Sequence, residues 1–377
     1  MKLPKLQIGN LIAEVPIVQG GMGVRVSLAS LATAVANEGG IGTISSMGLG
    51  DLRLSGKEFE ARSREALIRE IHKAKSLTSG VLAVNVMGAL SNAADLVRAA
   101  IVGGIRIIVF GAGLPMQLPV IADDPDVNLV PIISSSRVAA LIMRAWKKRY
   151  DRMVDAFIIE GPLAGGHLGY SREQLEHPEG CSLEKSLPEV LETVKPYEDD
   201  CGRKIPIIVA GGIYDGEDID RMLSLGASGV QMGTRFVCTD ECGASAEFKQ
   251  AYLDAKQEDI AIVKSPVGMT GRAIYNRFLK TIDEEGRQKI KCAYRCLTSC
   301  KIKDAKYCIA EALLNSVSGD VDRGLIFCGT NAFRVDKIVS VRALFEELLS
   351  GWQAAVARRA PLKVPSTSRK GPRLYSR

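Results

Sequence analysis

The stretch PIIVAGGIYDGEDIDRMLSLGASGVQMGTRF, residues 206–236, holds two apolar runs separated by an amphipathic segment. The runs PIIVAGGI and GVQMGTRF carry Val and Ile without strict alternation, whereas GEDIDRMLSLGA has the periodicity of a helix. Runs without alternation are typical of strands that are buried on both faces of a parallel sheet. The stretch therefore predicts a strand, a helix and a second parallel strand joined by a right-handed connection.

Six similar runs precede residue 206, with helical patterns such as SLASLATAVANEG between them. Eight strand–helix units predict an α/β fold of the (β/α)8 TIM barrel type. An open doubly wound sheet would show the spacing G-x-G-x-x-G after its first strand, and GGMGVR, residues 20–25, does not have this spacing. The six runs are VPIVQGGMG (15–23), GIGTISS (40–46), VLAVNVMG (81–88), IRIIVFGAG (105–113), LVPIISSS (129–136) and AFIIEGP (156–162).

The repeating pattern of strands and helices breaks after the eighth unit. We expect the barrel to span residues 1–259 and a small helical, cysteine-bearing cap, residues 260–334, to lie over its mouth, because this segment is too long for a bare connection. An amphipathic helix within residues 335–360 is expected to pack on the barrel. Residues 361–377 combine prolines, serines and basic side chains and predict a disordered basic tail.

Composition narrows the class of protein. A chain of 377 residues with 46% hydrophobic residues can bury a full core, and its net charge of +6 is modest. No apolar window reaches the length of a signal peptide or a membrane span, so we expect a cytoplasmic protein that does not cross a membrane. No basic stripe interleaved with aromatic residues indicates binding of nucleic acid. A homodimer is compatible with these features.

Glycines end the seventh and eighth predicted strands, where a barrel builds its phosphate site. Gly211 and Gly212 let backbone N–H groups approach an anion, and the helix predicted from about Asp215 would add its positive end. Gly233 with Thr234 offers another pair of N–H groups and a hydroxyl. These residues predict a phosphate cradle, although barrel turns also use glycine for tight passage from strand to helix.

The first predicted strand ends in QGGMG, residues 19–23, which lets bare backbone lie against a flat ligand. Asn85, after the third strand, can donate and accept hydrogen bonds in the same mouth. A flat ring together with a single phosphate suggests flavin mononucleotide (FMN).

The motifs PIVQGGMG, GPLAGGHLG, IVAGGI, GVQMGTRF and SPVGMTGRAI occur in this order between residues 16 and 274. In this combination the chain resembles the nitronate monooxygenase (2-nitropropane dioxygenase) family, which includes enoyl-acyl-carrier-protein reductase II, over most of residues 8–280. The resemblance implies an FMN-dependent barrel oxidoreductase. It also implies that His167 lies beside the reactive face of the flavin as the catalytic acid or base.

The resemblance further implies which residues hold the cofactor. Leu163 is a departure, because the family usually has glutamate two residues before the glycine pair Gly165–Gly166, and Glu160 stands where relatives often carry glutamine. Cofactor contacts on this side are therefore open. The implied cofactor-binding residues are Gln19, Gly20, Gly21, Met22, Gly23, Asn85, Glu160, Gly165, Gly166, Gly211, Gly212, Gly233 and Thr234.

Three functions fit these residues. The first is oxidative denitrification of alkyl nitronates, in which His167 bonds the nitro oxygens or takes the α-proton at near-neutral pH. The second is reduction of an activated double bond, such as an enoyl thioester, fed by NAD(P)H or by a ferredoxin-like carrier. Both act on a small-molecule substrate. The third is a non-catalytic redox sensor built on flavin and cysteines, and the plainest alternative for His167 itself is a core hydrogen bond.

Four of the nine cysteines crowd one segment with the spacing C-x3-C-x3-C-x7-C. Four thiolates suit a [4Fe-4S] cluster or, less well, structural zinc, although the spacing matches neither common ferredoxin runs nor paired C-x2-C knuckles. On one straight helix the thiols of residues 292 and 300 would be about 12 Å apart in rise, so shared ligation requires a broken helix. Four reduced thiols on a helical cap are the alternative. The candidate metal ligands are Cys292, Cys296, Cys300 and Cys308.

Overall fold

All eight apolar runs form parallel strands of one sheet. A computed structural model of the protein describes residues 3–51, 53–292 and 295–359, and the predicted tail at 361–377 lies outside these residues. The eight strands are β3 (Ile17–Gln19), β4 (Gly42–Ser45), β5 (Leu82–Met87), β6 (Ile107–Gly111), β7 (Asn128–Ile133), β8 (Phe157–Glu160), β10 (Ile207–Ala210) and β11 (Gly229–Met232).

The sheet closes on itself. Its order is β3-β11-β10-β8-β7-β6-β5-β4, and a parallel bridge between Val18 and Ile41 joins the two ends. Across this seam Gln19 N donates to Ile41 O at 2.9 Å, and Ile41 N donates to Ile17 O at 2.9 Å. The predicted (β/α)8 TIM barrel is therefore confirmed.

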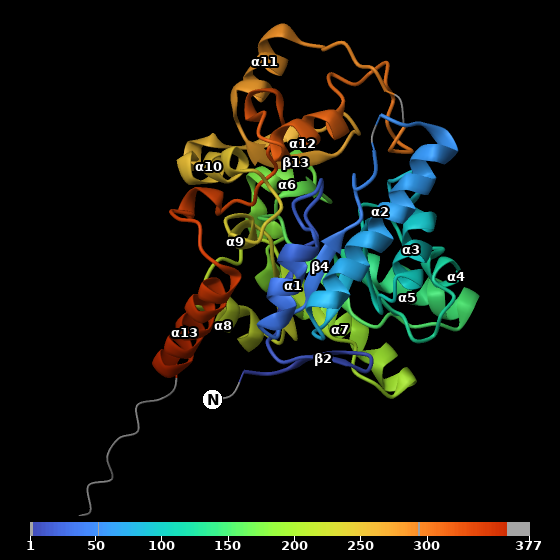
Figure 1. Cartoon of the computed structure of the whole chain (residues 1–377). Helices are drawn as coiled ribbons and strands as arrows, with labels where there is room; N and C mark the ends of the chain where they lie inside the picture. Colours follow the sequence, from blue (N-terminus) through green and yellow to red (C-terminus); the bar gives the residue numbers. More distant parts are fainter. Residues whose placement is uncertain (1–2, 52, 293–294, 360–377) are drawn as a thin grey trace, which may run out of the picture.

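Helices surround the barrel because each buries one apolar stripe against the strands (Figure 1). In α5 (Ser136–Tyr150) the buried apolar residues follow helical spacing, from Ala139 through Ile142 and Met143 to Trp146. The C-terminal helix α13 (Val341–Arg359) packs against α8 and α1 and completes the ring. The other helices of the ring are α1 (Ala29–Asn37), α2 (Gly56–Leu77), α3 (Ala93–Val102), α4 (Leu118–Ile121), α7 (Leu183–Cys201), α8 (Gly216–Ser224) and α9 (Thr234–Val237).

An N-terminal hairpin that the sequence pattern did not predict closes the lower end of the barrel. Strands β1 (Leu6–Ile8) and β2 (Leu11–Ala13) pair antiparallel near the N-terminus (Figure 1). The side chains of Leu6, Ile8 and Ala13 pack into the apolar core formed by the inward-facing residues of the strands. Because the hairpin fills this end of the barrel, a binding site is expected at the opposite end, where the strands have their carboxyl ends.

The segment after β11 covers this opposite end. It contains α10 (Ala246–Asp254), the hairpin β12 (Ile260–Lys264) and β13 (Thr270–Ile274), α11 (Arg277–Glu285) and α12 (Ile309–Val317). Strand β9 (Gly166–Leu168), which follows β8, pairs with β13, so barrel loop and cap share a three-stranded sheet. The cap thus contains a β-hairpin besides the helices that were expected, and its boundaries at 260 and 334 stay predictions. No helix of the described residues is long and apolar enough to cross a membrane.

Candidate active site

A cavity of about 270 Å3 lies at the carboxyl ends of the strands, under the cap. Its walls come from the ends of the barrel strands and from α12 and the loop after it. All the predicted catalytic and cofactor-binding residues line this cavity except Gln19. The barrel therefore gathers glycine-bearing strand ends that are far apart in the sequence, as the prediction required.

Gln19 has a different role from the predicted one. Its side chain is fully buried in the wall of the barrel, where the amide donates to Ser27 Oγ at 2.7 Å and also to Gly20 O. Its Oε1 accepts a hydrogen bond from Thr43 N at 3.0 Å. With both ends of the amide engaged, Gln19 braces the start of the first loop and does not reach the cavity.

The glycines of the predicted phosphate cradle have backbone that a side chain would obstruct. Gly211 and Gly212 have φ angles of 101° and 81°, a region that L-residues with side chains rarely adopt. A Cβ on Gly211 would stand 2.9 Å from Ala164 N. No hydrogen bond joins the N–H of Gly211, Gly212 or Gly233 to another described residue. Bare backbone with unpaired N–H groups fits a phosphate.

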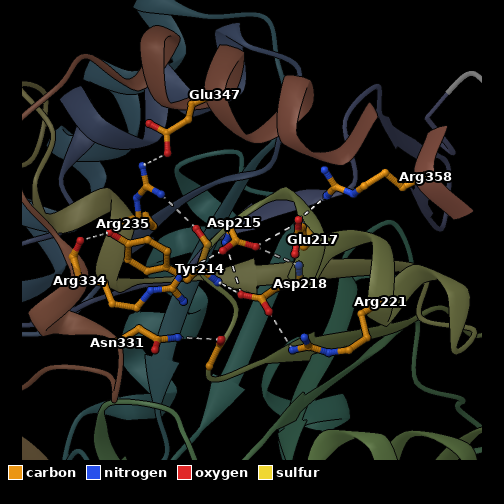
Figure 2. Close-up of polar contacts among 11 residues, drawn as sticks. Tyr214, Asp215, Glu217, Asp218, Arg221, Arg235, Asn331, Arg334, Glu347 and Arg358 are labelled. Atoms are coloured by element: carbon orange, nitrogen blue, oxygen red, sulfur yellow. Dashed lines mark hydrogen bonds and ion pairs between the residues drawn. The ribbon is translucent and has the colours of Figure 1, made fainter. Parts of the chain in front are cut away.

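Helix α8 does not contribute to this cradle, contrary to the prediction that its positive end would. Its first turn is capped by its own carboxylates (Figure 2): Asp215 accepts from the N–H groups of Glu217 and Asp218 at 3.1 Å, and Asp218 accepts from Tyr214 N at 2.8 Å. Two N–H groups of this first turn are taken by the Asp215 carboxylate, and the negative charge of the two carboxylates opposes the binding of an anion there.

A polar network holds the cradle from behind (Figure 2). Asn331 Nδ2 donates to Gly212 O at 2.9 Å, and the guanidinium groups of Arg235 and Arg334 lie 4.5 and 4.0 Å from the centroid of the Tyr214 ring. These contacts were not predicted, because Asn331 and Arg334 lie about 120 positions after the strand end that they support.

The side of the cavity predicted to face a flat ring holds two unsatisfied amides. Gly21 lies against Asn85, so close that a Cβ on Gly21 would be 2.3 Å from Asn85 Cβ. Gln231 Oε1 is buried in the described structure without a hydrogen-bond partner, and the Asn85 side chain makes no hydrogen bond to another described residue. Free amides beside bare backbone fit a ring that offers hydrogen-bond donors and acceptors along its edge.

His167 lies on β9, where the cap holds it. Its backbone is paired opposite Gly271 of β13, its Nε2 is 2.7 Å from Ser265 Oγ, and its ring meets the Phe327 ring edge-on at 5.0 Å. Burial lowers the pKa of His167 to about 4. The imidazole is therefore neutral near pH 7 and retains a nitrogen that can accept a proton.

Arg272 fixes the loop that leads to this histidine. Its buried guanidinium donates through Nη1 to Pro162 O at 2.8 Å and to Ala164 O at 2.5 Å. Gly165 lies so close to the backbone of Cys328 that a Cβ would be 2.4 Å from the carbonyl carbon. Ser265 and Arg272 belong to the motif SPVGMTGRAI, but no role was predicted for either residue. Their contacts are with residues about 100 positions earlier in the chain.

Glu160 ends β8 and lines the same cavity without forming an ion pair among the described residues. Burial raises the pKa of Glu160 to about 7. A carboxyl whose proton affinity is raised in the folded protein makes stability depend on pH.

Replacing Glu160 with glutamine is expected to remove this pH dependence. As the pH rises from 4.5, the usual pKa of the carboxyl, to about 7, the unfolded chain releases the proton and the folded chain keeps it, so wild-type stability falls and stays low above this window. Thermal unfolding of cofactor-free protein should show Glu160→Gln gaining stability relative to wild type at about pH 8 but not at about pH 4. An equal difference at both pH values would contradict this explanation.

The four clustered cysteines line a second cavity, next to the first, in the segment between α11 and α12. Within the described residues no three Cys, His, Asp or Glu side chains are placed to hold one metal ion. Neither a cluster nor a zinc site is shown by this arrangement.

The family model described as nitronate monooxygenase matches residues 5–351, which is most of the chain. The chain belongs to the nitronate monooxygenase family. The expected family and the expected class, a flavin-dependent oxidoreductase, are both confirmed by this match and by the relatives that follow.

Members and neighbours of the nitronate monooxygenase family differ in what they are named for. A probable nitronate monooxygenase of Staphylococcus saprophyticus is 28% identical over 310 residues, 75% of this chain and 82% of that protein. A 5-hydroxy-7a-methyl-1-oxo-octahydro-1H-indene-4-carboxyl-CoA dehydrogenase of Mycobacterium tuberculosis is 29% identical over 276 residues, 73% of this chain and about two thirds (67%) of that protein. The structure of FabK from Thermotoga maritima has a TM-score of 0.70 and 25% identity, covering 91% of this chain and 94% of that chain.

Proposed function

We propose that the protein oxidises alkyl nitronates with bound FMN and that His167 handles the proton of the substrate. The observation that carries this proposal is a neutral, buried imidazole on the wall of a cavity whose glycines fit a flavin phosphate and ring. Gly211, Gly212, Gly233 and Thr234 would hold the phosphate, and Gly20 to Gly23 with Asn85 would lie along the ring. When bound, FMN supplies an acceptor of an electron pair.

The tautomer of His167 decides how it acts. If the Ser265 hydroxyl donates a hydrogen bond to Nε2, the single N–H proton of the neutral imidazole is on Nδ1. Nδ1–H can then donate to a nitro oxygen that gains negative charge. If Nε2–H instead donates to Ser265 Oγ, Nδ1 is free to take the α-proton of a neutral nitroalkane. Ser265 is thus a positioning residue that selects between an electrophilic and a basic imidazole.

A second candidate function is reduction of an activated double bond in an acyl thioester. Two observations favour it: the relative in Mycobacterium tuberculosis is named for a CoA thioester, and apolar cap side chains, among them Leu313 and Phe327, face the cavity opposite the strand ends. His167 would then donate a hydrogen bond to the thioester carbonyl. The electron donor would be NAD(P)H or a ferredoxin-like carrier. Neither candidate function requires the protein to be a homodimer.

Two assays separate the candidates. The FMN-loaded protein should consume dioxygen with propionate 3-nitronate or nitroethane and release nitrite if the first proposal is right. Without dioxygen, loss of crotonyl thioester absorbance driven by NAD(P)H or dithionite, with no nitrite formed in the first assay, would establish the second. Protein that binds FMN yet turns over in neither assay would favour a redox sensor over both.

A further inference from the structure

The cysteine-bearing segment, residues 286–308, is non-helical where the structure describes it and is hydrogen-bonded to a loop of the barrel. Residues 286–308 contain no helix in their described part, so the predicted separation of thiols along a helix does not arise. The loop is tied to the loop after β5: Ser91 N donates to Cys296 O at 3.0 Å, Thr298 N donates to Ala89 O at 3.0 Å, and Leu297 forms an antiparallel bridge with Leu90. These ties give the short segment a fixed, non-helical course.

All four thiols consequently face one cavity. Its volume is about 610 Å3, and Cys292, Cys296, Cys300 and Cys308 all line it. Four neighbouring thiols in a partly buried cavity repel one another once ionised, and a bound cationic group relieves that repulsion.

Four cysteine thiolates are the usual ligand set of a cubane cluster, with one thiolate on each of its four irons. Arg295, Lys301 and Lys303 also line the cavity and would balance the negative charge of a cluster held by four thiolates.

We infer that this cavity binds a [4Fe-4S] cluster that exchanges electrons with the flavin site, which deepens the second candidate function and rests on it for its electron acceptor. Leu297 and Ile309 line both cavities, so the two sites share a wall. A redox group in the cysteine cavity would therefore be a neighbour of the flavin, closer to it than any carrier protein outside the cap.

The surface around the cavity fits an acidic carrier protein. Residues 287–306 contain seven Lys or Arg against one Asp, a net charge of +6 that equals the charge of the whole chain. All seven basic side chains are exposed, and none forms an ion pair within the parts of the chain that the structure describes. A concentrated field of one sign steers a partner of the opposite sign to this face.

The electrons balance with such a partner. Each reduced one-electron carrier, a small acidic iron–sulfur or flavin protein, loses one electron to the cluster and leaves oxidised. Two such transfers, with two protons from solvent, supply what bound flavin takes up, and one substrate double bond is then reduced.

The first test is metal content after anaerobic reconstitution with ferrous iron and sulfide, followed by desalting. Wild-type protein should retain about four irons and four sulfides per chain, and Cys296→Ser and Cys300→Ser should lose most of this iron while keeping FMN. Cys201→Ser, which replaces a thiol outside the cavity, is the matched control and should keep its iron. Less than about one iron per chain in wild type, or one zinc without sulfide, would overturn the inference.

FMN is measured in the same samples, so the two proposals fail separately. Iron without FMN would refute the flavin function and leave the cluster standing. FMN without iron would refute the cluster and leave the flavin function standing.

The second test is anaerobic reduction of the flavin by a reduced acidic ferredoxin. The triple variant Lys289→Glu, Lys291→Glu, Lys306→Glu, whose residues do not line the cavity, should react at least ~10-fold more slowly at low salt. A control triple of exposed, unpaired cations near the ends of α2 and α5, Lys73→Glu, Lys148→Glu, Arg149→Glu, has the same charge change and should react like wild type. Equal rates for both triples would refute the docking surface. Photochemical reduction, which needs no docking, should be unchanged in all three proteins.

Discussion

Replacing His167 with alanine is expected to lower kcat/KM by about 10² to 10⁴-fold while FMN remains bound. The imidazole is a neutral, titratable side chain on the cavity wall, and its contacts with Ser265 and Phe327 fix its orientation. The glycines expected to bind the phosphate lie on other strands, so the loss should fall on the chemical step. Steady-state kinetics with the substrate that the two assays identify, and flavin absorbance after gel filtration, measure the two effects separately.

Ser265→Ala is the companion variant, because Ser265 acts through His167. It should lower kcat less than His167→Ala does, and it should shift the acid limb of the pH–rate profile, since the histidine loses the partner that sets its tautomer. Ser265→Thr keeps the hydroxyl and should restore the wild-type profile. If His167→Ala kept full activity, the histidine would be a core residue and the proposed chemistry would be wrong.

The barrel was predictable because its signal is local. Each strand is a short apolar run closed by glycine or a small residue, and burial on both faces removes the alternation that would have indicated an open antiparallel sheet. The glycine pair at 211–212 and the Gly233–Thr234 turn could also be predicted, since barrel topology alone brings the carboxyl ends of β10 and β11 together.

The features that the sequence did not reveal depend on contacts across long stretches of chain. His167 was expected in a turn at the end of a strand, whereas pairing with β13, a hundred residues later, makes it part of a sheet. Gln19 was expected at the cofactor, but Ser27 and Thr43 engage its amide inside the barrel wall. A side chain's partners cannot be read from its neighbours in sequence when the partners arrive from another element.

The capping of α8 shows the same limit at closer range. Asp215 and Asp218 stand three residues apart before an apolar stripe, which is a helix-start signal, and the helix does start there. The same carboxylates occupy the N–H groups that the predicted phosphate contact needed. One local motif therefore specified the helix correctly and excluded the role that was given to its positive end.

Substituting Gly211 with alanine is expected to weaken FMN binding at least ~10-fold and to destabilise the protein by about 1–2 kcal/mol. The φ angle of 101° strains any residue with a side chain, and the new Cβ would stand 2.9 Å from Ala164 N and 3.0 Å from Gly161 O. Since both are backbone atoms, the loop that leads to His167 has to move away from the cradle. Fluorescence titration of cofactor-free protein with FMN and a thermal melt measure the two effects.

Gly202→Ala separates strain from loss of the site. Gly202 also has a positive φ angle, 67°, at the end of α7, but a Cβ there would meet nothing within 4 Å. This variant should lose about 1 kcal/mol of stability and bind FMN like wild type. If both variants bound FMN equally well, the N–H groups at 211 and 212 would not be the phosphate cradle. If only Gly211→Ala lost FMN, the bare backbone at that strand end would be the part of the barrel that holds the phosphate, because strain alone would have acted on both.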